Sequence, residues 1–191
     1  MSAASQPEPT SGVMLQVRDL RTHFPIRTGT IKAVDGVSFD VARGKTLCVV
    51  GESGSGKSVT ARSILQIVDE PGLIVSGSMV LYRPDGSSVD LAQLGRRSKE
   101  IRAVRGAEIA MIFQEPMSSL SPVHTVGNQI MEVLQLHLKM PKKEARARCV
   151  ELLTQVEIPN PDKAVDRYTF EFSGGMRQRV MIAMSLACNP A

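Results

Sequence analysis

The residues best suited to chemistry lie between Gly51 and Ser58, where the sequence reads Gly-Glu-Ser-Gly-Ser-Gly-Lys-Ser. A glycine, four free positions and then Gly-Lys-Ser form a phosphate-binding pattern. The glycines let backbone N–H groups turn toward an anion, and a helix that starts at the same point adds positive potential. We expect Lys57 to reach the β- and γ-phosphates of a nucleotide and the Ser58 hydroxyl to bind Mg²⁺. The alternative is a chance glycine–serine turn, which about one chain in a hundred of this composition would contain.

The elements on either side of this loop must position it. The apolar run Thr46–Val50, which contains Cys48, predicts a buried strand before the loop. The residues after the loop predict a helix of about four turns that ends near Val68. A strand, a glycine-rich loop and a helix in this order make a cradle for an anion, which strengthens the interpretation of the pattern.

The rest of the chain predicts a mixture of strands and helices. Thr125 is expected to cap one helix and Pro141 to lie in the first turn of the next. The expected elements are antiparallel β structure over residues 13–50, a strand over 77–82, a helix over 91–104, a strand over 108–113, helices from 123 to about 158, and a last helix from near Ser173.

Composition limits the class of protein. The 191 residues suffice for one domain with a core, and 42% hydrophobic with 22% charged residues are typical of a globular protein. No apolar run reaches the roughly 18 residues that span a bilayer. The net charge of +4 comes without a dense basic block and with few aromatic residues, which argues against nucleic acid as a partner. Residues 1–12 look like a disordered lead-in.

A second motif lies near the end of the chain, where Phe172 is followed by Ser-Gly-Gly-Met-Arg-Gln-Arg. Ser173 stands at a predicted helix start, and Gly174 and Gly175 allow close approach of a phosphate to the backbone amides. Taken alone, the segment is more typical of an ordinary helix cap, with Ser173 as the capping residue.

In series, the phosphate loop, the segment Phe113–Leu120 and the Ser-Gly-Gly segment resemble the nucleotide-binding subunit of an ABC transporter. The resemblance covers residues 13–190 and is closest to the ATP-binding subunits of dipeptide, oligopeptide and nickel importers. It implies an α/β fold, namely a P-loop NTPase with an antiparallel β subdomain, a parallel-sheet core and an inserted helical subdomain at about 115–172. Residues 13–191 would form this ATP-binding domain in part, because the core is expected to be incomplete.

The resemblance implies roles residue by residue. Gln114 and Lys57 would be the catalytic positions, and Gln114 with Ser58 would serve Mg²⁺. Phe24 would stack on adenine, although a core phenylalanine is the alternative. The nucleotide-binding residues would be Phe24, Gly51, Glu52, Ser53, Gly54, Ser55, Gly56, Lys57, Ser58, Val59, Ser173, Gly174 and Gly175.

The resemblance also implies partners. Ser173 to Gly175 would contact ATP held by a second ATP-binding subunit in a head-to-tail dimer. The segment Gln114–Leu120 and residues 123–126 would face membrane permease subunits, and an extracytoplasmic solute-binding protein would take part indirectly. The subunit would act peripherally at the cytoplasmic face of the inner membrane. Dipeptides, oligopeptides, nickel and glutathione all remain open as cargo.

The family's Mg²⁺-orienting aspartate, catalytic glutamate and switch histidine would follow Asn189-Pro190, and the sequence ends at Ala191. We therefore expect a C-terminally truncated piece that hydrolyses ATP very slowly, if at all, on its own. The leading hypothesis is the energy-coupling ATPase of a peptide-class importer. The alternatives are a soluble ABC-type ATPase without a membrane partner, a P-loop kinase, and an inactive nucleotide-binding fragment.

Overall fold

The structure is a computed structural model that describes residues 12–114 and 120–191. The chain divides into two compact units at Arg102 and Ala103, which we call the sheet unit and the helical unit. The predicted boundaries of the helical subdomain, about 115–172, stay a prediction. The predicted lead-in lies almost wholly outside the described residues, as do residues 115–119 of the predicted permease-facing segment.

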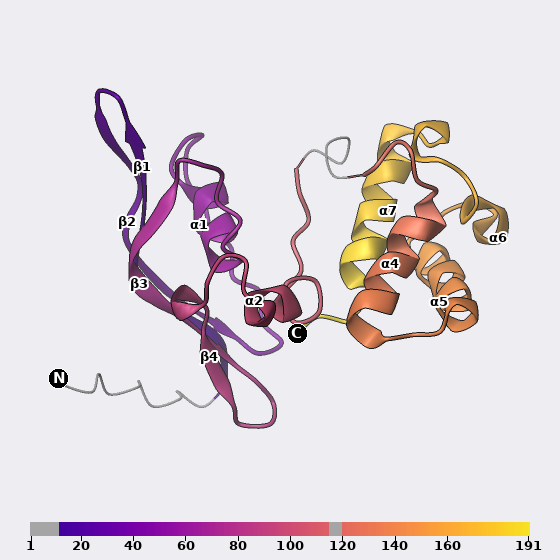
Figure 1. The fold of residues 1–191 in the computed structure, drawn as a ribbon, viewed down its shortest axis with the longest axis horizontal. Coiled ribbons are helices and arrows are strands. Elements are labelled where there is room, and N and C mark those ends of the chain that lie inside the picture. The colour runs from indigo at the N-terminus through magenta and orange to yellow at the C-terminus, as the bar shows by residue number, and fades with distance from the viewer. Residues whose placement is uncertain (1–11, 115–119) are drawn as a thin grey trace. The chain divides into compact units, whose positions relative to one another are not determined.

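The sheet unit is built on a four-stranded antiparallel sheet in the order β2-β1-β3-β4 (Figure 1). The predicted antiparallel β structure is confirmed, because β1 and β2 form a long hairpin in which Val17 lies opposite Phe39 and Thr22 opposite Val34. The strands are β1 Val13–Ile26, β2 Gly29–Ala42, β3 Leu73–Tyr82 and β4 Ser88–Asp90. The short helices of this unit are α1 Lys57–Ile64 and η1 Leu91–Gln93, and α2 Lys99–Val104 crosses the division between the units.

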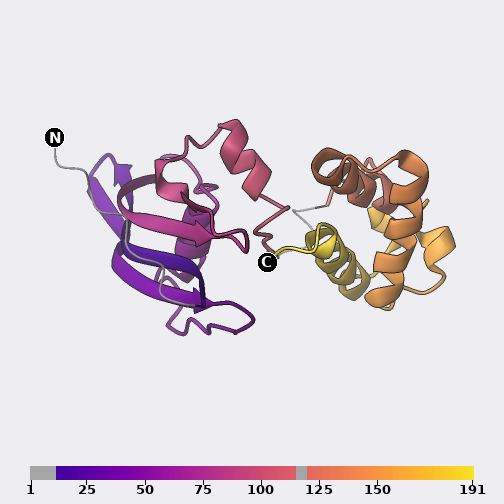
Figure 2. The ribbon, with the colours of Figure 1, turned by 90° about the horizontal axis from the view of Figure 1, so that it is seen from below.

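Alternation along β1 explains how this unit forms its core. Leu20 and Thr22 are fully buried, whereas Asp19 is exposed. The buried face of β1 receives α1, and both views show this helix beside the sheet (Figure 1 and Figure 2). An ion pair also joins β1 to β2, because the Arg18 guanidinium donates to both carboxylate oxygens of Asp40 at 2.6 and 2.7 Å. This pairing holds the pKa of Asp40 below its ordinary value.

Two strands predicted from apolar runs are not formed. Residues 46–50 have no regular structure, and Val50 is 91% exposed, so the predicted buried strand is wrong and Cys48 is exposed rather than in a core. Residues 110–113 are likewise irregular, with a single bridge between Arg105 and Ile109 beside them. A strand forms only where another strand accepts its hydrogen bonds, and neither run has such a partner among the described residues.

Two predicted helices are shorter than expected. The helix after the glycine-rich loop ends at Ile64 instead of near Val68, because Gln66 adopts a left-handed backbone (φ 53°) that stops a right-handed helix. The Gln66 side-chain amide then donates to the Leu94 carbonyl at 2.7 Å, which fixes the turn. The helix expected over residues 91–104 is two separate pieces, η1 and α2.

The helical unit packs its helices around one core (Figure 1). The predicted N-cap at Thr125 is confirmed, since its hydroxyl accepts from the Asn128 N–H. Leu134 and Leu153 are fully buried, and burying one such side chain contributes about 1.5–3 kcal/mol. The helices are α4 Val126–Leu138, α5 Lys142–Gln155, α6 Pro161–Ala164 and α7 Gly174–Leu186, with a 3-10 turn η2 at Thr169–Glu171.

An ion pair and a buried thiol mark the α5 side of this unit. Arg146 on α5 donates to both carboxylate oxygens of Asp166 at 2.7 and 2.8 Å, and this contact holds the pKa of Asp166 below its ordinary value. Cys149, one turn further along α5, is fully buried, and burial raises the pKa of its thiol to about 12.

Candidate functional site

The glycine-rich loop leads directly into α1 with backbone angles that suit glycine. Gly54 has φ 82° and Gly56 has φ 87°, both in the left-handed region that L side chains rarely adopt. Gly56 is also the N-cap residue of α1, and no side chain caps this helix end. The first turn of α1 carries no acidic residue. Its free N–H groups and its dipole therefore offer positive potential to an anion.

The loop rests closely on the β1–β2 hairpin. A methyl group placed on Gly56 would lie 2.2 Å from the carbonyl oxygen of Ala33 on β2. Only glycine permits this approach, so the start of α1 is held against the sheet. The Thr60 hydroxyl, one turn into α1, donates to the Gly56 carbonyl at 3.0 Å and adds a second contact that stabilises the start of the helix.

Lys57 closes the loop on itself. Its Nζ donates to the carbonyl oxygens of Gly51 and Glu52, each at 2.6 Å, and lies 3.3 Å from the Ser55 hydroxyl. The ammonium thus sits beside the helix end whose N–H groups are free. This set of donors fits phosphate oxygens, and the exposed Ser58 hydroxyl next to Lys57 offers an oxygen of the kind that Mg²⁺ prefers.

Phe24 lies in the same unit as the loop, on β1. Its ring is half-buried against the turn that follows α1, since a methyl group placed on Gly72 would lie 2.6 Å from Cε1 of the ring. The same methyl group would lie 2.5 Å from Val68. One side of the ring is therefore packed by the protein, in keeping with the core role weighed from the sequence, and part of the residue stays exposed.

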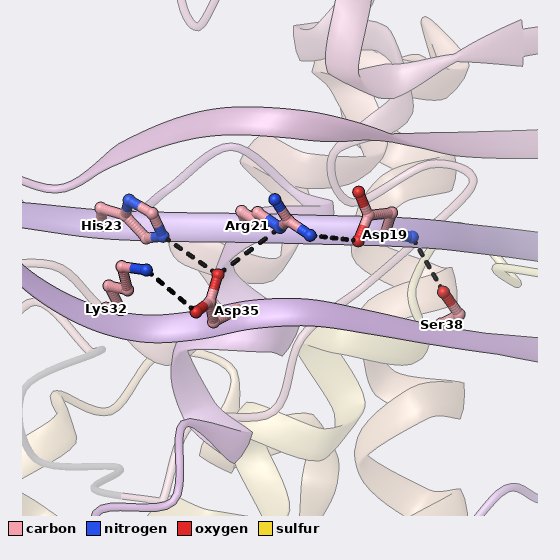
Figure 3. A network of polar contacts seen from close by, with 6 residues as sticks. All are labelled: Asp19, Arg21, His23, Lys32, Asp35 and Ser38. Carbon is pink, nitrogen blue, oxygen red and sulfur yellow. Dashed lines mark hydrogen bonds and ion pairs between the residues drawn. The ribbon is translucent and has the colours of Figure 1, made fainter.

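The face of β1 turned away from α1 carries a polar network (Figure 3). Asp35 lies 3.3 Å from Lys32 Nζ, 3.5 Å from Arg21 Nε and 3.6 Å from His23 Nε2. The hydrogen bond from Lys32 is the main cause that holds the pKa of Asp35 below its ordinary value. Figure 3 shows that the network joins β1 to β2, so it stabilises the hairpin that carries Phe24 and Ala33.

In the helical unit, the Ser-Gly-Gly segment starts α7. Ser173 is the N-cap residue, and its hydroxyl accepts from the Met176 N–H at 3.4 Å, so the helix cap predicted from the sequence is present. Gly174 and Gly175 are exposed, and a methyl group on either would meet no atom within 4 Å. The segment before them is fixed by Arg177, which donates to the Thr169 carbonyl at 2.8 Å. An anion has open access to this helix start.

Gln114 is exposed at the edge of the described residues in the helical unit. The loop Gly51–Val59 and Phe24 therefore belong to the sheet unit, whereas Ser173–Gly175 and Gln114 belong to the helical unit. No group of three or more His, Cys, Asp or Glu side chains could hold a metal ion within residues 12–114 and 120–191.

Sequence reasoning missed two buried hydroxyls that support this site. Thr22 and Ser63 are fully buried and their hydroxyl oxygens lie 2.8 Å apart. The alternation of β1 contained a signal, because Thr22 falls on the same face of the strand as Leu20 and Phe24. The partner on α1 had no signal in the sequence.

Comparison with known proteins decides the family. A model of the ABC transporter family matches residues 34–191, the greater part of the chain. The chain belongs to the ABC transporter family. This confirms the family predicted from the three motifs, and ATP is the nucleotide that the ATPase domain of ABC transporters binds.

Relatives of this ABC chain are named for import or transport. The glutathione import ATP-binding protein GsiA of Pectobacterium atrosepticum is 46% identical over 190 residues, which cover 96% of this chain and 30% of that protein. The oligopeptide transport ATP-binding protein OppD of Bacillus subtilis is 48% identical over 177 residues, covering 93% of this chain and 48% of that protein. The chain thus spans about a third to a half of the length of these relatives.

A solved ABC cassette supports the predicted α/β fold class. The dimeric post-hydrolysis structure of the ATP-binding cassette MJ0796 bound to ADP and Pi has a TM-score of 0.77 and 24% identity, and covers 93% of this chain and 71% of that chain. Within the part of the ABC chain that the structure describes, no helix is both long and apolar enough to cross a membrane.

Proposed function

We propose that this ABC chain is the ATP-binding, energy-coupling part of a peptide-class importer, in which ATP hydrolysis drives transport. The observation that carries the proposal is the uncapped start of α1, wrapped by a glycine-rich loop with the Lys57 ammonium inside it. The names of the relatives, glutathione import for GsiA and oligopeptide transport for OppD, favour a transport role over a soluble ABC-type ATPase without a membrane partner.

In this function the loop Gly51–Val59 holds the triphosphate of ATP. The amides of the first turn of α1 and the Lys57 ammonium bind phosphate oxygens, and Phe24 supplies an apolar surface to the base. Ser58 and Gln114 are the residues that would hold Mg²⁺, and a bound ion would supply positive charge against the charge that develops on the phosphates. Lys57 must leave the carbonyls of Gly51 and Glu52 in part, and phosphate oxygens replace those acceptors.

The Ser-Gly-Gly segment has a different task. We assign Ser173, Gly174 and Gly175 to the ATP held by a second ATP-binding subunit in a head-to-tail dimer. The open surroundings of both glycines support this assignment, as does the dimeric state of the MJ0796 cassette. ATP would then join two subunits, and hydrolysis would let them separate.

The same proposal places the subunit peripherally at the cytoplasmic face of the membrane, against permease subunits. Val123 is 73% exposed and His124 is exposed just before α4, so this segment offers an apolar contact to such a partner. A solute-binding protein would deliver cargo to the permease and would not touch this chain. Small peptides, including glutathione, are the cargo class that the names of the relatives support.

Substitution of Lys57 tests the nucleotide site. Lys57→Ala removes a charge-assisted contact worth about 1.5–3 kcal/mol, so calorimetry on the purified chain should record ATP affinity lower by about ten- to a hundredfold. Lys142→Ala, which removes an exposed lysine from the start of α5, is the matched control and should leave the affinity unchanged. Equal ATP affinity of the Lys57→Ala and Lys142→Ala variants would refute the proposed site.

A further inference from the structure

A buried pair of hydroxyls joins the central strand of the hairpin to the helix that follows the phosphate loop. Thr22 on β1 and Ser63 on α1 are both 0% exposed, and their oxygens are 2.8 Å apart. The Ser63 hydroxyl donates to the Val59 carbonyl at 2.7 Å, so its proton is already used. Thr22 is therefore the donor and Ser63 the acceptor between the two elements.

The pair links the two elements that carry the two parts of the proposed ATP site. Phe24 follows Thr22 by two residues on the same face of β1, about 7 Å along the strand. Ser63 lies six residues after Lys57, about 9 Å along α1 from the helix end that would hold phosphate. A rigid strand and a rigid helix thus extend from this one hydrogen bond toward the base site and the phosphate site.

A second contact attaches α1 to the same stretch of the hairpin. Thr22 pairs with Val34 on β2, and the neighbouring Ala33 carbonyl is the atom that Gly56 approaches. The Gly56 contact fixes the start of α1 sideways against the sheet. The Thr22–Ser63 bond fixes how far the helix is displaced along its own axis, because a hydroxyl bond tolerates only a few tenths of an ångström.

We propose that Thr22 and Ser63 are positioning residues that hold the base site at Phe24 and the phosphate site at the loop at the separation that one ATP molecule bridges. This inference rests on the proposed function. An apolar pair of the same size would fill the same space, but it would leave α1 free to slide against β1. The hydrogen bond therefore matters to a ligand that uses both sites and not to one that uses the loop alone.

Calorimetry with two ligands, ATP and inorganic triphosphate, tests the inference on the whole chain in the presence of Mg²⁺. Thr22→Val and Ser63→Ala should each weaken ATP binding by about three- to tenfold and leave triphosphate binding unchanged. The double variant should bind ATP no more weakly than either single variant, because one bond is lost in all three. Thr22→Ser keeps the donor and should bind ATP as the wild-type chain does.

A stability control separates positioning from loss of folded protein. Ile130→Val shortens a fully buried side chain in the helical unit and should leave the ratio of the two affinities unchanged. Equal weakening of ATP and triphosphate by Ser63→Ala would overturn the inference, and so would additive losses in the double variant. A wild-type chain that binds neither ligand would overturn the proposed function and the inference with it. A chain that binds both ligands equally would overturn the inference alone.

Discussion

Replacement of Gly56 by alanine is the sharpest structural test of the phosphate loop. The new methyl group would lie 2.2 Å from the Ala33 carbonyl oxygen, which belongs to the backbone of β2 and cannot rotate away. Overpacking of this kind costs about 1–3 kcal/mol. The residue must also keep φ near 87°, which costs a non-glycine residue about 1–2 kcal/mol. Gly56→Ala should therefore destabilise the start of α1 by about 2–5 kcal/mol.

Gly54→Ala is the matched control within the same loop. Gly54 has nearly the same backbone angle, φ 82°, but a methyl group there would meet no atom within 4 Å. It should therefore cost only the conformational share, about 1–2 kcal/mol. The difference between the two variants isolates the close approach of α1 to β2.

Native-state hydrogen exchange of the α1 amides is the appropriate assay, because local opening is read directly from their protection. Protection should fall much further in Gly56→Ala than in Gly54→Ala, and ATP affinity should fall in the same order. If both variants lost protection equally, the close contact between Gly56 and Ala33 would contribute nothing to the stability of α1 and would not hold the loop against β2.

Two further predictions concern the cysteines and the ion pair beside α5. Iodoacetamide should modify the exposed Cys48 in the native protein and spare Cys149, because the thiol of Cys149 is buried and its pKa is raised to about 12. Mass spectrometry of the folded chain measures the labelling of each cysteine. Rapid labelling of Cys149 before unfolding would contradict its burial. Asp166→Asn should lower stability at pH 7 by about 0.2–1 kcal/mol, because it removes an exposed pair with Arg146. The pKa of Asp166 is lowered in the folded state, so the pair stabilises above the unfolded pKa of about 3.9, and its contribution is lost as the pH falls from there through the lowered folded value. Urea titrations of both proteins at several pH values measure the difference, and a gap that stayed constant down to acid pH would count against the ion pair.

The helix caps and the glycine-rich loop could be predicted because their causes are local. Thr125 and Ser173 each accept from an N–H three residues further on, so the signal and its effect lie within one turn of helix. The positive φ angles of Gly54 and Gly56 likewise follow from the sequence pattern of the loop. The family followed from these same motifs, and the comparison with the ABC transporter family confirmed it.

The strands expected at residues 46–50 and 108–113 show where local reasoning stops. An apolar run indicates that a segment gains stability when other parts of the protein bury it. It does not indicate whether a neighbouring strand is present to form the hydrogen bonds that a strand requires. The early end of α1 has a similar origin. Gln66 leaves the helical conformation because its side chain finds the Leu94 carbonyl, which is 28 residues away in the sequence.

By itself, the amino-acid sequence predicted which residues of this ABC chain would bind a triphosphate, since glycine conformation, helix polarity and the lysine charge act over a few residues. Only the tertiary structure decided which contacts hold the glycine-rich loop and α1 in place. The approach of Gly56 to Ala33, the packing of Phe24 on Gly72 and the bond between Thr22 and Ser63 join residues 23 to 48 positions apart in the chain. Such contacts depend on how a strand and a helix pack in three dimensions, and no spacing along one segment encodes them.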